Sequence, residues 1–156
     1  MRITTYNVEN LNGKYTLVKE RSQNYPKANA LVHPNVVVDM MNDLCNAKRK
    51  AEEYVWLLAL DTKGHLTGLF EVTHGTVNFS VVTPREVFVR LCLCGAVNCI
   101  LVHNHPSGDT SPSMDDMKFT RQIKSAGELM YIKLLDHLII GDDCYYSFKE
   151  NNNILE

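Results

Sequence analysis

Two histidines stand one residue apart at the end of a short apolar run. The stretch "HNHPSGDTSPSMDD" (103–116) directly follows "CILV" (99–102). In an extended segment the side chains at positions i and i+2 point to the same side, so His103 and His105 can present both imidazoles to one point. Neutral imidazole is a common ligand for zinc, copper, iron and nickel. The pair therefore predicts a metal site at the end of a buried strand.

Two histidines alone would leave a metal ion under-coordinated, but a carboxylate from Asp116 can return across the intervening loop. Three protein ligands with an open fourth position are typical of a catalytic zinc, and a water bound there has a pKa of roughly 7. Two alternatives stay open. Asp115 is a competing ligand one position away, and Ser113 with Asp116 also fits an ordinary capping box at a helix start.

Three segments carry the signals of helices that would frame this motif. Apolar residues recur at three- and four-residue steps after Pro34, which can open a helix because its missing N–H needs no partner there. Thr83, Pro84 and Glu86 supply an N-cap, a first helical position and a capping-box acid. We therefore expect helices over about residues 34–52, 83–95 and 113–127.

Runs of apolar or β-favouring residues predict the strands. "YVWLLAL" (54–60) is continuously apolar and predicts a central strand buried on both faces, and the turn "DTKG" (61–64) predicts a hairpin to the next strand. The expected strands are 14–20, 54–60, 65–73, 76–82, 99–102, 131–140 and 144–148. Because strands and helices alternate without regular βαβ units, we expect an α/β fold with a mixed β-sheet flanked by helices.

Length and composition fit one domain with a short polar extension. The chain has 156 residues, 45% of them hydrophobic and 22% charged, an ordinary globular balance. We expect residues 1–30 to form an N-terminal extension with one edge strand, and residues 31–156 to form the domain. Five cysteines without a C-x-x-C pair favour reduced thiols. Together with the polar N-terminus, which lacks a secretory signal, they indicate a cytoplasmic location.

The charge of the chain argues against bulk electrostatic binding to nucleic acid. The formal net charge is −2, and the one dense basic run, Lys48 to Lys50, fits a solvated helix face. We expect weak nucleic-acid binding at most. No apolar stretch approaches the roughly 18 residues of a membrane span, so membrane insertion is not expected either.

The motif resembles that of a known enzyme family. "HNHPSGDTSPSMDD" fits the H-x-H-x7-S-x2-D pattern of the JAMM (MPN) metalloproteases at every specified position. The blocks "LDTKGHL", "GTVN", "PREVF", "ILVHNHPSGD", "DHLIIGD" and "YYSF" resemble the RadC-like branch of that family, in the same order. The resemblance covers about residues 30–150. Asn104 between the histidines and Pro106 after them also fit this branch, whereas the eukaryotic deubiquitinating members usually have Ser or Thr there.

This resemblance implies a fold similar to that of the cytidine deaminases and one zinc ion per chain, bound by His103, His105 and Asp116. It also implies an upstream glutamate at the junction of the first long helix and the first core strand. Glu53 stands there and is assigned as the general base, with Glu52 as the second choice.

The same resemblance implies that Ser113 helps to stabilise an oxyanion, and that the protein is a zinc-dependent metallohydrolase. Its substrate would be a peptide or an isopeptide-linked protein. The alternative is a non-catalytic interaction module that keeps the metal for stability. One form of this alternative is a module that associates with DNA. A nucleobase deaminase is set aside, because that class needs H-x-E followed by P-C-x-x-C. His137 in "LDHLII" is expected to face the core or the edge of the site.

Overall fold

The computed structural model describes residues 1–75 and 82–151. Within these residues, seven strands form one mixed sheet in the order β2-β1-β4-β3-β5-β6-β7. The elements are β1 (Arg2–Leu11), β2 (Lys14–Asn24), α1 (Pro34–Cys45), η1 (Ala47–Arg49), β3 (Glu53–Leu60), β4 (Leu66–Gly75), α2 (Pro84–Leu93), β5 (Asn98–Asn104), α3 (Met114–Met130), β6 (Lys133–Ile140) and β7 (Tyr145–Ser147). The predicted α/β fold with a mixed, helix-flanked sheet is confirmed.

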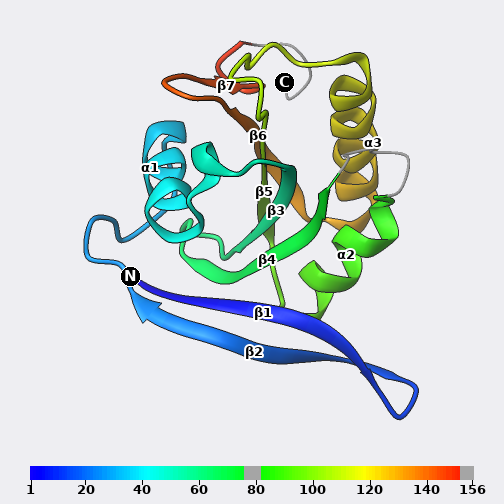
Figure 1. The fold of residues 1–156 in the computed structure, drawn as a ribbon. Helices are drawn as coiled ribbons and strands as arrows, with labels where there is room; N and C mark the ends of the chain where they lie inside the picture. Colours follow the sequence, from blue (N-terminus) through cyan, green and yellow to red (C-terminus); the bar gives the residue numbers. More distant parts are fainter. Residues whose placement is uncertain (76–81, 152–156) are drawn as a thin grey trace.

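Helices cover both faces of the sheet, so its central strands are buried on both sides (Figure 1). Helix α1 packs on one face, whereas α2 and α3 pack on the other. Strand β3 alternates between these two cores: Trp56 and Leu58 face α1, and Leu57 faces α2 and α3. Full burial of each such side chain contributes about 1.5–3 kcal/mol, which makes β3 and its neighbour β5 a rigid base for the residues at their ends.

The first helix is shorter than the predicted 34–52. Helix α1 ends at Cys45, because Asn46 adopts a left-handed conformation (φ 51°) that closes the helix. The side chain of Asn42 then accepts a hydrogen bond from the backbone N–H of Lys48, at 3.0 Å, and holds the chain as it turns into η1. As a result Glu53 is the first residue of β3 and not the last of a helix.

The third helix is longer than the predicted 113–127. Helix α3 continues through Gly127 and ends at Met130, with Tyr131 as its left-handed cap (φ 54°). Gly127 is needed for a different reason: a Cβ atom at this position would collide with the backbone carbonyl of Ile132. This glycine lets the chain after α3 pass close to the helix and does not stop the helix.

The N-terminal residues form a hairpin of two long strands, β1 and β2, joined by a turn at Asn12 and Gly13 (Figure 1). The predicted edge strand lies within β2, which forms one edge of the sheet. Strand β1 was not predicted, and it joins the hairpin to the domain by parallel pairing of Thr5 with Leu69. The division of the chain at residue 30 stays a prediction.

The remaining predicted elements follow the sequence closely. The hairpins β3–β4 and β6–β7 are present, β5 contains the predicted strand 99–102, and α2 begins with the expected Thr83–Glu86 capping box. The predicted strand over 76–82 falls on residues 76–81, which lie outside the described residues. In the described ranges 1–75 and 82–151, no helix combines the length and the apolar character needed to cross a membrane.

Candidate metal centre

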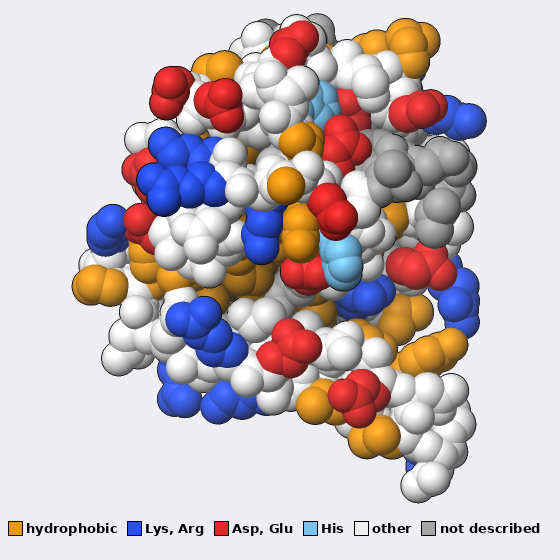
Figure 2. Space-filling view, in the orientation of Figure 1, with side chains coloured by type: hydrophobic (Ala, Val, Ile, Leu, Met, Phe, Trp, Pro, Cys, Tyr) orange, Lys and Arg blue, Asp and Glu red, His pale blue; other side chains and the backbone are white. Residues whose placement is uncertain are grey.

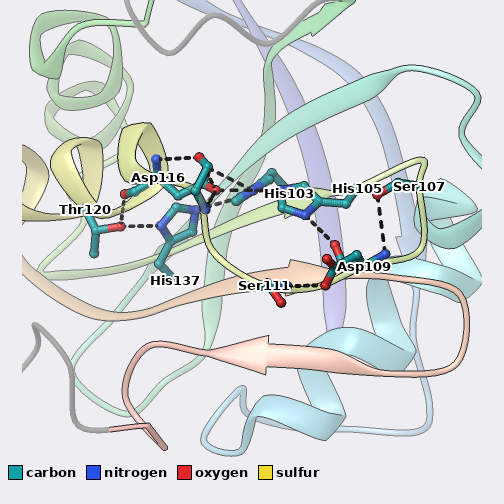
Figure 3. Close-up of polar contacts among 9 residues, drawn as sticks. His103, His105, Ser107, Asp109, Ser111, Asp116, Thr120 and His137 are labelled. Carbon is teal, nitrogen blue, oxygen red and sulfur yellow. Dashed lines mark hydrogen bonds and ion pairs between the residues drawn. The ribbon is translucent and has the colours of Figure 1, made fainter.

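Two elements meet at the candidate site: the carboxyl end of β5 and the first turn of α3 (Figure 3). His103 lies at the end of β5, His105 follows directly after it, and Asp116 lies in the first turn of α3. Strand β5 is paired on both sides, with β3 and β6, so His103 is fully buried. Asp116 is also buried, whereas His105 is partly exposed and leaves one approach to the site open.

The three side chains offer ligand atoms that face one another. The Nε2 atoms of His103 and His105 are 3.0 Å apart. Oδ1 of Asp116 is 3.2 Å from Nε2 of His103, and Oδ2 of Asp116 is 3.7 Å from Nε2 of His105. Zinc–ligand bonds of about 2.0–2.2 Å in a tetrahedral site place neighbouring ligand atoms roughly 3.3 Å apart. The three residues therefore form a group that could hold one metal ion.

The proton on His105 supports the same conclusion. Nδ1 of His105 lies 2.6 Å from the backbone carbonyl oxygen of Asp109, and a carbonyl can only accept. Nδ1 therefore carries a proton, and the lone pair of the neutral ring is on Nε2, directed at the centre. The two Nε2 atoms are 3.0 Å apart and each lies within 3.7 Å of one of the two oxygens of the Asp116 carboxylate, which is a donor set that suits zinc.

The helix cap and the proposed ligand role use different atoms of Asp116. Oδ2 accepts hydrogen bonds from the backbone N–H and the hydroxyl of Ser113, both at 2.6 Å, and Oγ of Ser113 accepts from the backbone N–H of Asp116 at 3.1 Å. The capping box thus fixes the carboxylate with Oδ1 toward His103. Asp115, the competing candidate, is exposed to solvent and is not part of the group.

The charges of the centre are strongly coupled. Burial raises the pKa of the Asp116 carboxyl, but its interactions with the protonated forms of His103 and His105, together with the hydrogen bond from Ser113, outweigh burial and hold that pKa well below its ordinary value. The hydrogen bond with Asp116 raises the pKa of His105, and the nearby charge of Glu53 adds to this rise. The centre therefore stabilises positive charge placed between the carboxylate and the imidazoles, which is the charge that a metal ion brings.

Glu53 lies beside the group without belonging to it. Val55 pairs with His103 across β3 and β5, so Glu53, two residues earlier, is on the same face of the sheet and nearer to His105. The buried side chain of Asn104 fixes this backbone: its Oδ1 accepts from the N–H of Tyr54 at 2.8 Å, and its Nδ2 donates to the carbonyl of Glu52 at 3.0 Å. The amide between the two histidines thus holds the backbone on both sides of Glu53.

Two buried residues behind the centre were not assigned to the site from sequence. Nε2 of His137 is 2.9 Å from Nδ1 of His103, and Nδ1 of His137 is 2.7 Å from Oγ1 of Thr120 (Figure 3). His137, expected at the core or the edge of the site, is thus both buried and in contact with a candidate ligand. Thr120 was missed, although its position four residues after Asp116 on a helix places it on the same face.

Comparison with known proteins places the chain in a family. Residues 31–153 match the family described as the RadC-like JAB domain. A UPF0758 protein of Chlorobium phaeovibrioides is 48% identical over 105 residues, which cover 67% of this chain and 47% of the relative. A UPF0758 protein of Trichlorobacter lovleyi is 43% identical over 118 residues, which cover 76% of this chain and 50% of the relative. The chain therefore spans about half the length of the curated relatives it matches. By this match, the chain is a member of the RadC-like JAB domain family, within the JAMM/MPN group.

Proposed function

We propose that this chain is a zinc-dependent metallohydrolase that cleaves amide bonds, as a peptidase or an isopeptidase. The observation that carries the proposal is the convergence of two Nε2 atoms and one carboxylate within 3.0–3.7 Å, with a further carboxylate, Glu53, held nearby but outside the ligand group. Membership in the RadC-like JAB family supports this chemistry. The names of the curated relatives state no activity, so the substrate has to be identified by experiment.

In this proposal His103, His105 and Asp116 would hold one zinc ion per chain, and His105 is the member of the group that reaches the surface. When bound, zinc supplies a Lewis acid that polarises the scissile carbonyl and lowers the pKa of a bound water to roughly 7. The burial of His103 and Asp116 excludes solvent from the rear of the centre.

Glu53 acts as the general base and then as the general acid. Its carboxylate accepts a proton from the attacking water and later delivers a proton to the leaving amine, a role that needs proximity to the metal but no direct bond to it. The hydrogen bonds of Asn104 to the backbone on both sides fix the position from which Glu53 does this. Glu52, the second choice, is exposed and precedes β3.

Ser113 is proposed to stabilise the oxyanion with its hydroxyl. A serine hydroxyl has one proton, and here that proton is donated to Oδ2 of Asp116. The proposal therefore requires the proton to turn toward the substrate when the tetrahedral oxyanion forms, while the backbone N–H of Ser113 continues to hold Asp116.

The decisive experiment combines metal analysis with cleavage assays. Purified protein is assayed for zinc by elemental analysis and incubated with libraries of peptides and of isopeptide-linked substrates, with and without a chelator. We expect about one zinc per chain and cleavage that the chelator abolishes and added zinc restores. If zinc-loaded protein cuts none of these substrates, the non-catalytic interaction module becomes the better account.

Nucleic acid is not the proposed partner. The net charge is −2, and Figure 2 shows Lys and Arg side chains interspersed with Asp and Glu over the visible face. Binding that depends on phosphate contacts weakens steeply with salt, so we expect only weak binding that disappears at physiological ionic strength. Sub-micromolar DNA binding at that ionic strength, measured by fluorescence anisotropy, would favour the interaction module instead.

A further inference from the structure

A chain of four polar groups starts at His103 and runs into the interior of the protein (Figure 3). Nδ1 of His103 contacts Nε2 of His137 at 2.9 Å, and Nδ1 of His137 contacts Oγ1 of Thr120 at 2.7 Å. Oγ1 of Thr120 in turn donates to the backbone carbonyl of Asp116 at 2.6 Å. The side chains of His103, Thr120 and His137 are all 0% exposed. The chain of contacts therefore begins at one candidate ligand and ends on the backbone of another.

The chemistry of the last group sets the direction of every hydrogen bond. A carbonyl oxygen only accepts, so Thr120 donates its single hydroxyl proton to Asp116. The same hydroxyl oxygen can then only accept from His137, which must carry a proton on Nδ1. His137 is fully buried and packs against the rings of Phe119 and Phe148, where a charged imidazolium would be costly, so its Nε2 carries a lone pair.

The same logic continues to His103. The lone pair on Nε2 of His137 faces Nδ1 of His103, so Nδ1 of His103 must donate. A neutral His103 with its proton on Nδ1 has its lone pair on Nε2, which is the atom that faces His105 and Asp116. In the opposite tautomer, the proton would sit on Nε2 and occupy the position of the metal ion.

We propose that His137 and Thr120 are positioning residues that lock His103 in the tautomer that binds metal. The inference rests on the metal site of the proposed function, but it does not depend on peptidase activity. Partners that accept the second N–H of a ligating histidine typically affect metal affinity 10–100-fold when removed. Here that partner is not a backbone carbonyl but a second histidine, whose own proton is fixed by a threonine on α3.

The isosteric change Thr120→Val isolates this role. Valine cannot accept the Nδ1 proton of His137, so His137 is expected to move its proton to Nε2, which forces His103 to carry its own proton on Nε2. Zinc affinity should fall about 10–100-fold. Thr120→Ser keeps the hydroxyl and its bond to the carbonyl four residues earlier, and should bind zinc nearly as tightly as the wild type. Ile123→Val, a buried change on the same helix, controls for loss of packing.

The test uses two measurements. Two-bond ¹⁵N–¹H spectra of the imidazole rings in metal-free protein report which nitrogen is protonated, and competition with a chromophoric chelator reports zinc affinity. We expect Nδ1 protonation of His103 and His137 in the wild type and in Thr120→Ser, and a changed pattern with weaker zinc binding in Thr120→Val alone.

A neutral His103 in the metal-free wild type that carries its proton on Nε2 and none on Nδ1 would overturn the proposal, even if no variant folds. Wild-type affinity of a folded Thr120→Val would overturn it as well. The outcomes also distinguish the proposed peptidase activity from the positioning role of His137 and Thr120. If the protein shows the expected tautomers and binds zinc but cleaves no substrate, the positioning role is supported and the peptidase activity is excluded.

Discussion

His103 and His105 stand one residue apart, yet the protein supports them in different ways. His103 is fully buried, and its Nδ1 proton goes to the side chain of His137. His105 is partly exposed, and its Nδ1 proton goes to the backbone carbonyl of Asp109 in the loop before α3. Because a backbone carbonyl is present whatever the side chain, the support of His105 tolerates substitution. The support of His103 depends on two specific side chains and can be broken by one mutation.

The largest effect is expected where both histidines lose their common partner. Asp116→Ala removes the carboxylate that lies 3.2 Å from His103 and 3.7 Å from His105, so zinc should fall from about one per chain to near zero in elemental analysis. It also removes one half of the α3 cap, with a stability cost of about 1 kcal/mol.

The matched control for this change is the neighbouring carboxylate. Asp115→Ala alters an exposed residue outside the group and should retain zinc. If Asp115→Ala loses the metal and Asp116→Ala keeps it, the assignment of the ligand is wrong by one residue.

The next effect concerns rate rather than metal binding. Glu53→Gln is nearly isosteric but cannot accept a proton from water, so zinc content should stay unchanged while cleavage slows about 10²–10⁴-fold. Rates are compared at matched zinc content, with Glu52→Gln as the control. Cleavage at the wild-type rate by Glu53→Gln would exclude it as the base, and an inactive Glu52→Gln would transfer that role to Glu52.

A smaller difference tests the comparison of the two histidines directly. Asp109→Ala removes a carboxylate that accepts from the N–H of Ser111 at 2.9 Å, but it leaves the carbonyl that accepts from His105. Zinc affinity should therefore change by less than about tenfold, below the range expected for Thr120→Val. Equal losses in the two variants, measured by chelator competition, would show that the loop supports its histidine as specifically as the buried chain does.

In the hydrogen-bonded chain from His103 to Asp116, the sequence was sufficient to predict these two end residues but not the two residues between them, His137 and Thr120. Periodicity and capping signals placed β5 and α3, and the spacing of His103, His105 and Asp116 indicated that their side chains converge. The spacing of Thr120 from Asp116 places both on one helix face, but a threonine inside a helix does not reveal which side chain it contacts, so this residue was not assigned to the site. His137 reaches the site through the parallel register of β5 and β6, which pairs it with Leu101, and that register depends on the whole fold.

Local signals also failed where tertiary packing decided the outcome. Gly127 resembles a helix stop in the sequence, but a glycine is needed there because the backbone of Ile132 passes too close for a side chain. Strand β1 is too polar to be recognised from hydrophobic alternation, since most of its residues face solvent on at least one side and its pairing with β2 sets its conformation. Asn46 ends α1 early, and a single asparagine is a weak stop signal in sequence.

The smallest effect is expected in the alkylation rates of the cysteines, which report on the mobility of the segments that carry His103 and His105. Cys144 is exposed and lies beside the His105 loop, with its Sγ 3.6 Å from Oγ1 of Thr110, whereas Cys92 is exposed at the distant end of α2. Zinc bound by His105 should reduce the opening of this loop and slow alkylation of Cys144 roughly two- to fivefold, while Cys92 reacts at an unchanged rate.

Cys99 supplies the contrast from the buried side of the centre. Cys99 is the first buried residue of β5, and burial raises the pKa of its thiol to about 12. Because the thiolate is the reactive form, Cys99 should resist alkylation at pH 8 both with and without zinc. Peptide mapping by mass spectrometry separates the three sites. An equal zinc effect at Cys144 and Cys92 would mean that zinc stabilises the whole protein, and the loop around His105 would then be no more mobile than the strand that carries His103.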